Sequence, residues 1–301
     1  MKNIGGQAVI EGVMMRSPNA WTVAVRGPNK EIFVKKEEIP PLPKLLKKPV
    51  LRGVVALVQS LMLGIKAITY SAEKAMPEEE GKSSSFSMGF TVFLAFVLGI
   101  VIFLLLPLYA TKLLGIVFKI VAENSIAFNL VDGAIRIFFF LLYVVLISIN
   151  KDIKRVFQYH GAEHKTIYAH EAGVELTVEN VESYSILHPR CGTSFLLIVM
   201  ILSILIFSSI PKDWPFIEKF LSRVVLIPLI AGLSYEFIKF SSKKINNPLV
   251  RMMTKPGLWL QQLTAKTPSN DQVEVAIMAL KEVLHMEAEI AERKKGEGHA
   301  D

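Results

Sequence analysis

Long uninterrupted apolar segments are the clearest pattern along this chain. Residues 88–107 contain no charged side chain, and a helix rising about 1.5 Å per residue crosses a hydrocarbon core of about 30 Å in roughly 20 residues. Three more segments are predominantly apolar: 128–149, 194–210 and 224–240. We therefore expect a mainly α-helical, multi-pass membrane protein with about four transmembrane helices.

Two further segments are apolar but interrupted. Polar and charged side chains break the run 51–70, which favours an amphipathic helix lying on the membrane or against the other helices. A fifth transmembrane helix over these residues is the alternative. Residues 108–121 contain two lysines and are a second interfacial or re-entrant candidate.

Near the two ends of the chain, apolar residues occur in shorter runs and at regular spacing. Residues 5–38 form short runs separated by turn residues, and the runs 7–15, 21–26 and 31–36 predict a small N-terminal antiparallel β-meander. Near the C-terminus, a Ser-Asn-Asp capping sequence at 269–271 precedes apolar residues at helical spacing. This pattern predicts a C-terminal amphipathic helix.

These patterns divide the chain into consecutive parts. They are a β-meander with a Pro-rich linker (1–50), an amphipathic helix and polar loop (51–87), a first transmembrane hairpin (88–149), a cytoplasmic linker that bears His and Cys (150–193), a second transmembrane hairpin (194–242), and C-terminal interfacial and amphipathic helices (243–301).

Composition and charge narrow the class of protein. Of the 301 residues, 51% are hydrophobic and 20% are charged, which argues against an ordinary soluble enzyme. The net charge of +7, without a basic groove interleaved with aromatic residues, favours the lipid bilayer as partner and no nucleic acid. Lys and Arg flank the predicted spans at 52–82, 151–155 and 239–251, so the positive-inside rule places these flanks and both termini in the cytoplasm.

Candidate chemistry is concentrated in the linker 150–193. His160 and His164 are four residues apart, one turn along one helix face, so both rings can reach one cation. Glu163 lies between them, where a carboxylate either binds the metal or acts as a base. Further along, His188 and Cys191 stand three residues apart in a Pro/Gly turn, and a thiolate there suits zinc. Cys191 is the only cysteine, which excludes an intrachain disulfide.

Three interpretations of this cluster stay open. If all four His and Cys side chains bind, the site is a closed structural zinc site. If only three bind and Glu163 stays free, one coordination position is open to water and hydrolysis becomes available. The third interpretation is a group of polar interfacial side chains with no metal.

Other ionisable residues are weaker candidates. Glu11 and Arg16 bracket a turn in the N-terminal meander, where spacing alone suggests a surface pair. Asp132 and Arg136, four residues apart in the second span, are expected to satisfy each other. Glu236, near the end of the fourth span, either reaches the interface or pairs with a neighbouring lysine.

Several motifs together carry a resemblance to a known family. They are the segment 5–16 (GGQAVIEGVMMR), the segment 160–165 (HGAEHK), the segment 188–193 (HPRCGT), Tyr235-Glu236, the segment 256–261 (PGLWLQ) and the segment 272–276 (QVEVA). Over nearly its whole length the chain resembles the YqhQ-like family of uncharacterised bacterial membrane proteins, described as predicted metal-dependent enzymes.

The resemblance implies a set of site residues and a location. It marks Glu11, Arg16, His160, Glu163, His164, His188 and Cys191. It thereby raises Glu11 and Arg16 from a surface pair to catalytic candidates beside Glu163, because the meander would fold over the linker and complete the site. It also implies a bacterial cytoplasmic membrane.

These observations lead to one expected function and one alternative. We expect a hydrolytic enzyme with a divalent metal of the zinc type at the cytoplasmic membrane surface, with Glu163 as base and a lipid-linked or membrane-protein substrate. The alternative is a non-enzymatic membrane scaffold or regulator whose metal is structural.

Overall fold

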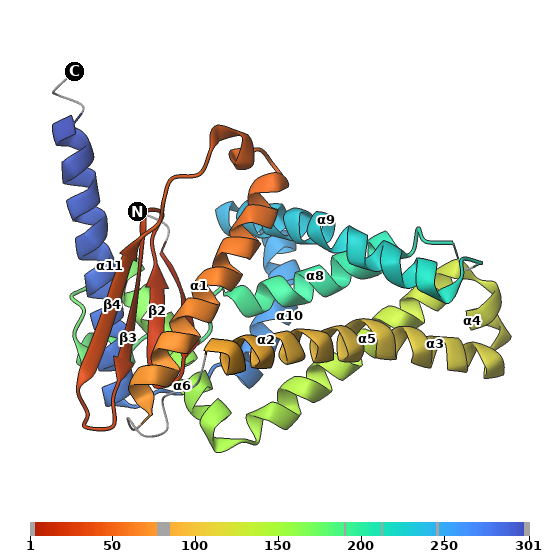
Figure 1. The fold of residues 1–301 in the computed structure, drawn as a ribbon, viewed down its shortest axis with the longest axis horizontal. Coiled ribbons are helices and arrows are strands. Elements are labelled where there is room, and N and C mark those ends of the chain that lie inside the picture. Colours follow the sequence, from red (N-terminus) through yellow and green to blue (C-terminus); the bar gives the residue numbers. More distant parts are fainter. Residues whose placement is uncertain (1–3, 77–84, 190, 212, 245–246, 298–301) are drawn as a thin grey trace.

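The protein is mainly helical, with one small sheet at its N-terminal end. The computed structural model describes residues 4–76, 85–189, 191–211, 213–244 and 247–297. In Figure 1 the sheet and the C-terminal helix α11 (Asn270–Glu297) form a body, from which several long helices extend side by side as an arm. Residues 77–84, part of the segment 51–87 predicted as an amphipathic helix and polar loop, and Arg190 of the HPRCGT motif lie outside the described residues.

The sheet confirms the predicted antiparallel meander but has one more strand. Its strands β1 (Gly5–Val9), β2 (Gly12–Arg16), β3 (Ala20–Arg26) and β4 (Ile32–Glu38) pair in sequence order. The prediction of a single strand over 7–15 is wrong, because the chain turns back at Ile10 and Glu11, where Glu11 has a φ of 50°. Gly12 then passes so close to β3 that a Cβ would lie 2.3 Å from the Ala24 carbonyl oxygen.

Helices cover both faces of this sheet. On one face, α1 (Leu51–Ala75) packs against Met14, Trp21 and Val23. On the other face, α11 and α6 (Lys151–Glu171) pack against Val13 and Met15. Because both faces are buried, β2 and β3 read as nearly continuous apolar runs.

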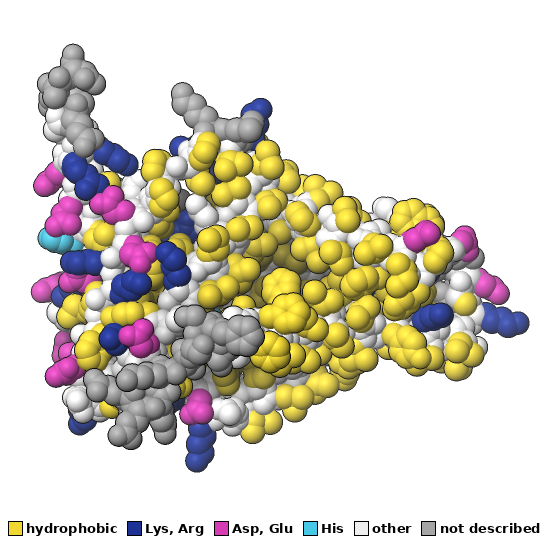
Figure 2. Space-filling view, viewed as in Figure 1, with side chains coloured by type: hydrophobic (Ala, Val, Ile, Leu, Met, Phe, Trp, Pro, Cys, Tyr) yellow, Lys and Arg dark blue, Asp and Glu magenta, His cyan; other side chains and the backbone are white. Residues whose placement is uncertain are grey.

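Three described helices are long and apolar enough to cross a membrane. Their residue bounds are Leu51–Ala75, Gly89–Val117 and Ser125–Ser148, and the last of the three is α5. The apolar helix α8 (Gly192–Phe207) is shorter, and the fourth predicted span lies inside α9 (Phe216–Lys243). Figure 2 shows hydrophobic side chains covering the arm, with charged side chains gathered on the body and at the far tip.

The first apolar helix continues past the predicted end of its span. It runs through α2 (Ser85–Ile100), the π-helical segment η2 (Val101–Leu105) and α3 (Leu106–Val117), followed by α4 (Lys119–Glu123). Pro107 has no N–H and its ring crowds the carbonyl four residues earlier. The wider π turn just before Pro107 makes room for this ring, so most of 108–121 extends the helix instead of forming a separate interfacial segment.

A buried charge cluster joins the helices of the arm. Asp132 of α5 accepts hydrogen bonds from Arg136 Nη2 and from Arg223 Nη1 of α9, both at 2.8 Å. Arg136 also donates to Ser203 of α8 at 3.0 Å. The sequence therefore identified the Asp132–Arg136 pair but missed its second arginine, which is 91 residues away from Asp132 along the chain.

A second ion pair connects α1 to α9. Arg52 Nε donates to Glu236 Oε1 at 2.6 Å, and Arg52 Nη2 donates to the other carboxylate oxygen. The hydrogen-bonding partner of Glu236 is thus Arg52 of α1, which the sequence did not suggest, while Lys239 on its own helix also interacts with it electrostatically. The remaining elements are η1 (Lys44–Lys47), α7 (Val178–Glu182) and α10 (Pro248–Thr264).

Candidate metal centre

Helix α6 carries three of the seven candidate residues, His160, Glu163 and His164, and is held close to the segment that follows α10. Asn150 caps its first turn by accepting the N–H groups of Asp152 and Ile153. At Gly161 the helix passes against the chain after α10, where a Cβ would lie 2.0 Å from the Lys266 carbonyl oxygen. This close approach sets the position of the two histidines on either side of Gly161.

The hydrogen bonds of both histidines define their tautomers. His160 Nδ1 lies 2.7 Å from the Thr264 carbonyl oxygen, and His164 Nδ1 lies 2.5 Å from the Ile186 carbonyl oxygen. A carbonyl oxygen only accepts, so each Nδ1 carries a proton and each Nε2 of a neutral ring keeps a free lone pair. Backbone carbonyls on Nδ1 are the usual outer partners of metal-binding histidines.

The two Nε2 atoms converge on the thiol of Cys191. The Cys191 Sγ atom lies 3.1 Å from His160 Nε2, and the ligand atoms of His160, His164 and Cys191 all lie within 4.8 Å of one another. Cys191 is the N-cap of α8, where its Sγ also lies 3.4 Å from the Thr193 nitrogen. Three of the four predicted ligands therefore lie together, and their binding of a metal stays a prediction.

This donor set fits a divalent metal of the zinc type. Two imidazole nitrogens and one thiolate are ligands that zinc prefers. His164 Nε2 is buried, and its polar neighbour is the Cys191 thiol, which already contacts His160 Nε2 at 3.1 Å. A buried lone pair that shares its donor in this way is costly unless something else occupies it. Burial also lowers the pKa of His164, outweighing the neighbouring Cys191, and this disfavours the doubly protonated ring.

His188 lies beside this group but not in it. Its ring centroid is 5.7 Å from that of His164 and 4.4 Å from that of Tyr168. Its Nε2 lies 3.5 Å from Glu171 Oε2. The structure therefore brings the predicted fourth ligand next to the cluster, with its ring nitrogen near a carboxylate of α6.

Glu163 is buried beside the histidines and contacts the first strand. It is 6% exposed and accepts the backbone N–H of Gly6. A Cβ at Gly6 would lie 2.8 Å from Glu163 Cδ, so only glycine allows β1 to approach this carboxyl group. Burial raises the pKa of Glu163, while His160 and His188 act in the opposite direction.

Glu11 and Arg16 do not form the surface pair that their spacing suggests. Glu11 accepts hydrogen bonds from Arg155 Nε at 2.5 Å and from the Tyr159 hydroxyl at 3.2 Å. Arg16 donates to Gln59 Oε1 at 2.8 Å and to Ser60 Oγ at 3.3 Å. The two side chains are therefore separated, and Arg16 is directed toward α1.

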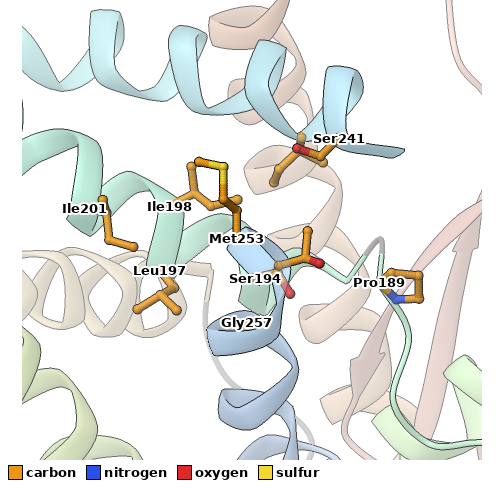
Figure 3. Close-up of a pocket in the computed structure, with 10 residues that line it drawn as sticks. Pro189, Ser194, Leu197, Ile198, Ile201, Ser241, Met253 and Gly257 are labelled. Carbon is orange, nitrogen blue, oxygen red and sulfur yellow. The ribbon is translucent and has the colours of Figure 1, made fainter. Parts of the chain in front are cut away.

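Arg16 and Cys191 line the same open pocket. It has a volume of about 530 Å³ and lies where the sheet meets α1, α8 and α9, with Leu57, Phe195 and Ile238 among its apolar walls. Arg16 thus lies in the same pocket as one candidate metal ligand. Figure 3 shows a smaller hollow between α8, α9 and α10, lined by Ser194 and Met253 among others. That hollow has a volume of about 20 Å³, which is room for about one water.

Two residues that position the site were not singled out from the sequence. Lys165 is buried and donates to the carbonyl oxygens of Glu182 and Tyr184, which holds the loop that carries Ile186. Gln261 of α10 binds both backbone polar groups of His188. Both residues belong to the motifs that carry the family resemblance. These motifs could have marked the two residues as candidates, but they do not indicate that the side chains hold the backbone near the site.

Comparisons with known proteins agree with that resemblance. Residues 48–286 match the family described as "Protein of unknown function (DUF1385)". The chain is 35% identical over 311 residues to the "Uncharacterized protein YqhQ" of Bacillus subtilis (strain 168), covering 98% of this chain and 96% of that protein. No solved structure matches. Neither description names an activity, so the metal-dependent chemistry stays a prediction. The extent of both matches shows that the chain belongs to the DUF1385 family.

Proposed function

We propose that this protein is a multi-pass protein of the bacterial cytoplasmic membrane and a metal-dependent hydrolase of the zinc type. His160, His164 and Cys191 would hold the divalent metal, and Glu163 would serve as the base. The substrate would be lipid-linked or a membrane protein, because the site lies where the polar body meets the apolar arm. Both termini and the body would face the cytoplasm, as the flanking Lys and Arg indicate.

The convergence of two imidazole lone pairs on one thiol is the observation that carries this proposal. Both Nδ1 protons are directed at carbonyl oxygens, so neither Nε2 has a proton to donate. A thiol has one proton and can serve only one of the two nitrogens. A cation bound by all three atoms satisfies the whole group, which is why metal binding explains the geometry better than hydrogen bonding alone.

The position of His188 favours a catalytic over a structural site. With three ligands from the chain, one coordination position remains open, as in catalytic zinc sites. These residues would hold a cation that would supply Lewis acidity toward a carbonyl or phosphoryl oxygen and toward water. Glu163 follows His160 by three residues on α6 and would take the proton from that water.

Metal analysis of the purified, detergent-solubilised protein tests the site. We expect about one zinc per chain in the wild type and in Glu163→Gln, and loss of zinc in His164→Ala and Cys191→Ser. His285→Ala is the matched control, since His285 is 66% exposed on α11. A wild type without stoichiometric metal would refute the proposal.

The His188→Ala variant separates the catalytic site from the structural alternative. Retention of zinc in this variant is expected for a site with three ligands. Loss of zinc in a variant that still folds would assign His188 as a fourth ligand. The protein would then be a scaffold or regulator with a closed structural metal site.

A further inference from the structure

We infer that the pocket beside Arg16 binds the phosphate headgroup of an anionic lipid. This inference names the substrate class of the proposed metal site and rests on that proposed function. The pocket joins a cationic side chain, an apolar wall and a metal-ligand residue in one space.

Arg16 is the anion-binding element of this pocket. Its guanidinium group has five N–H donors, and the neutral oxygens of Gln59 and Ser60 accept two of them. Within the part of the chain that the structure describes, no carboxylate lies at ion-pair distance from Arg16. The other arginines of the body pair with carboxylates: Arg26 with Glu274, Arg155 with Glu11 and Arg293 with Glu38. Arg16 therefore keeps its charge and several donors for a ligand, and phosphate matches the guanidinium fork.

The walls of the pocket suit the acyl chains of a lipid. Leu57 of α1, Phe195 of α8 and Ile238 of α9 line it. Leu57 is 38% exposed, and its neighbours on α1, Val58 and Leu61, are 51% and 52% exposed. The apolar wall is thus continuous with the exposed apolar surface of α1, so the tails of a bound lipid can leave the pocket along that helix.

The metal-ligand cluster lies next to the same pocket. Cys191 lines it together with Gly192, the first residue of α8. A phosphate held by Arg16 would therefore face the cation proposed at Cys191. The N-terminus of the 16-residue helix α8 adds a partial positive charge on the same side.

The sheet edge beside the pocket argues against a polypeptide substrate. A peptide commonly binds by adding a strand to a free edge. Here β1 is the edge strand, but α6 packs along it and Glu163 accepts the N–H of Gly6. This edge is therefore already occupied where it approaches the candidate ligands.

Lipid titration of the delipidated, full-length protein in a neutral detergent tests the inference. Binding of short-chain phosphatidylglycerol and phosphatidylcholine is followed by native mass spectrometry. We expect the wild type to prefer phosphatidylglycerol and Arg16→Gln to bind it at least about tenfold more weakly. Arg293→Gln is the control for net charge. Ser60→Glu places a carboxylate beside Arg16 at an exposed position, and we expect the same loss without removal of a packed side chain.

Three outcomes would overturn the inference. They are equal affinity of wild type and both variants, equal affinity for the two lipids, and full competition by inorganic phosphate, which would indicate a site for free phosphate. The first two would favour a polypeptide substrate instead.

Zinc content is measured in the same samples. Arg16-dependent lipid binding without zinc would refute the metal enzyme alone, whereas zinc with Arg16-independent binding would refute the lipid site alone.

Discussion

The side-chain amide of Gln261 binds both backbone polar groups of His188. Gln261 Oε1 accepts the His188 N–H at 2.8 Å, and Gln261 Nε2 donates to the His188 carbonyl oxygen at 2.8 Å. Gln261 is fully buried. One side chain of α10 thus fixes the loop between Ile186, whose carbonyl orients His164, and Cys191.

Replacing Gln261 is expected to weaken both the fold and the proposed metal site. Gln261→Ala removes the side-chain acceptor of the buried His188 N–H, at a cost of about 1–3 kcal/mol. The His188 carbonyl oxygen loses one of its donors but keeps the Cys191 N–H at 3.3 Å. Because Gln261 holds the loop whose Ile186 carbonyl oxygen orients His164, we also expect weaker metal binding in this variant. Thermal unfolding and zinc competition with a chelator measure the two effects. The exposed neighbour provides the control Gln262→Ala, and identical behaviour of the two variants would contradict the role of Gln261.

A methyl group at Gly161 is expected to separate α6 from the segment after α10. The Cβ of Gly161→Ala would lie 2.0 Å from a backbone oxygen, which cannot rotate away. Such overpacking costs about 1–3 kcal/mol, and it would displace the carbonyl of Thr264 from His160. We expect a lower melting temperature together with weaker zinc binding. At Gly296 a Cβ meets nothing within 4 Å. Gly296→Ala should therefore leave both quantities unchanged, and wild-type values for Gly161→Ala would show that the contact is not rigid.

Neutralising Asp132 is expected to destabilise the arm. Asp132→Asn leaves Arg136 and Arg223 buried without their shared anion, and removal of one partner of a buried ion pair costs about 3–5 kcal/mol. Thermal unfolding in detergent micelles measures this loss. Asp213→Asn, at an exposed position near the tip, is the matched control. A melting temperature equal to that of the control would mean that the two arginines find other partners.

Most of the architecture follows from local pattern. Apolar length predicted the helices at 88–107 and 128–149, and short runs separated by turn residues predicted the meander. The errors come from long-range contacts. Residues 7–15 read as one strand because both faces of β1 and β2 are covered, so apolar residues flank Glu11 and Gly12 on both sides and no longer polar segment marks the turn. The helix continues past Pro107 because a π turn accommodates the ring, which the apolar sequence around it does not reveal.

For the candidate site, too, residue spacing predicted the local relationships but not the long-range contacts. The spacing of His160 and His164 placed both rings on one helix face, and the chemistry of Cys191 suggested a shared cation. Spacing alone could not show that Glu11 pairs with Arg155 while Arg16 turns to α1, because these partners lie 144 and 43 residues away along the chain.

The sequence by itself determined the family, the helical and membrane-like character and the residue types of the site, because each is written in composition, periodicity or motif. The tertiary structure decided which of those residues meet. Carbonyl oxygens of Thr264 and Ile186 orient two lone pairs toward one thiol, and the junction of sheet and arm places Arg16 in the pocket that Cys191 lines. These relationships depend on how α10, the loop before α8 and the sheet pack around α6, and no local sequence pattern encodes them.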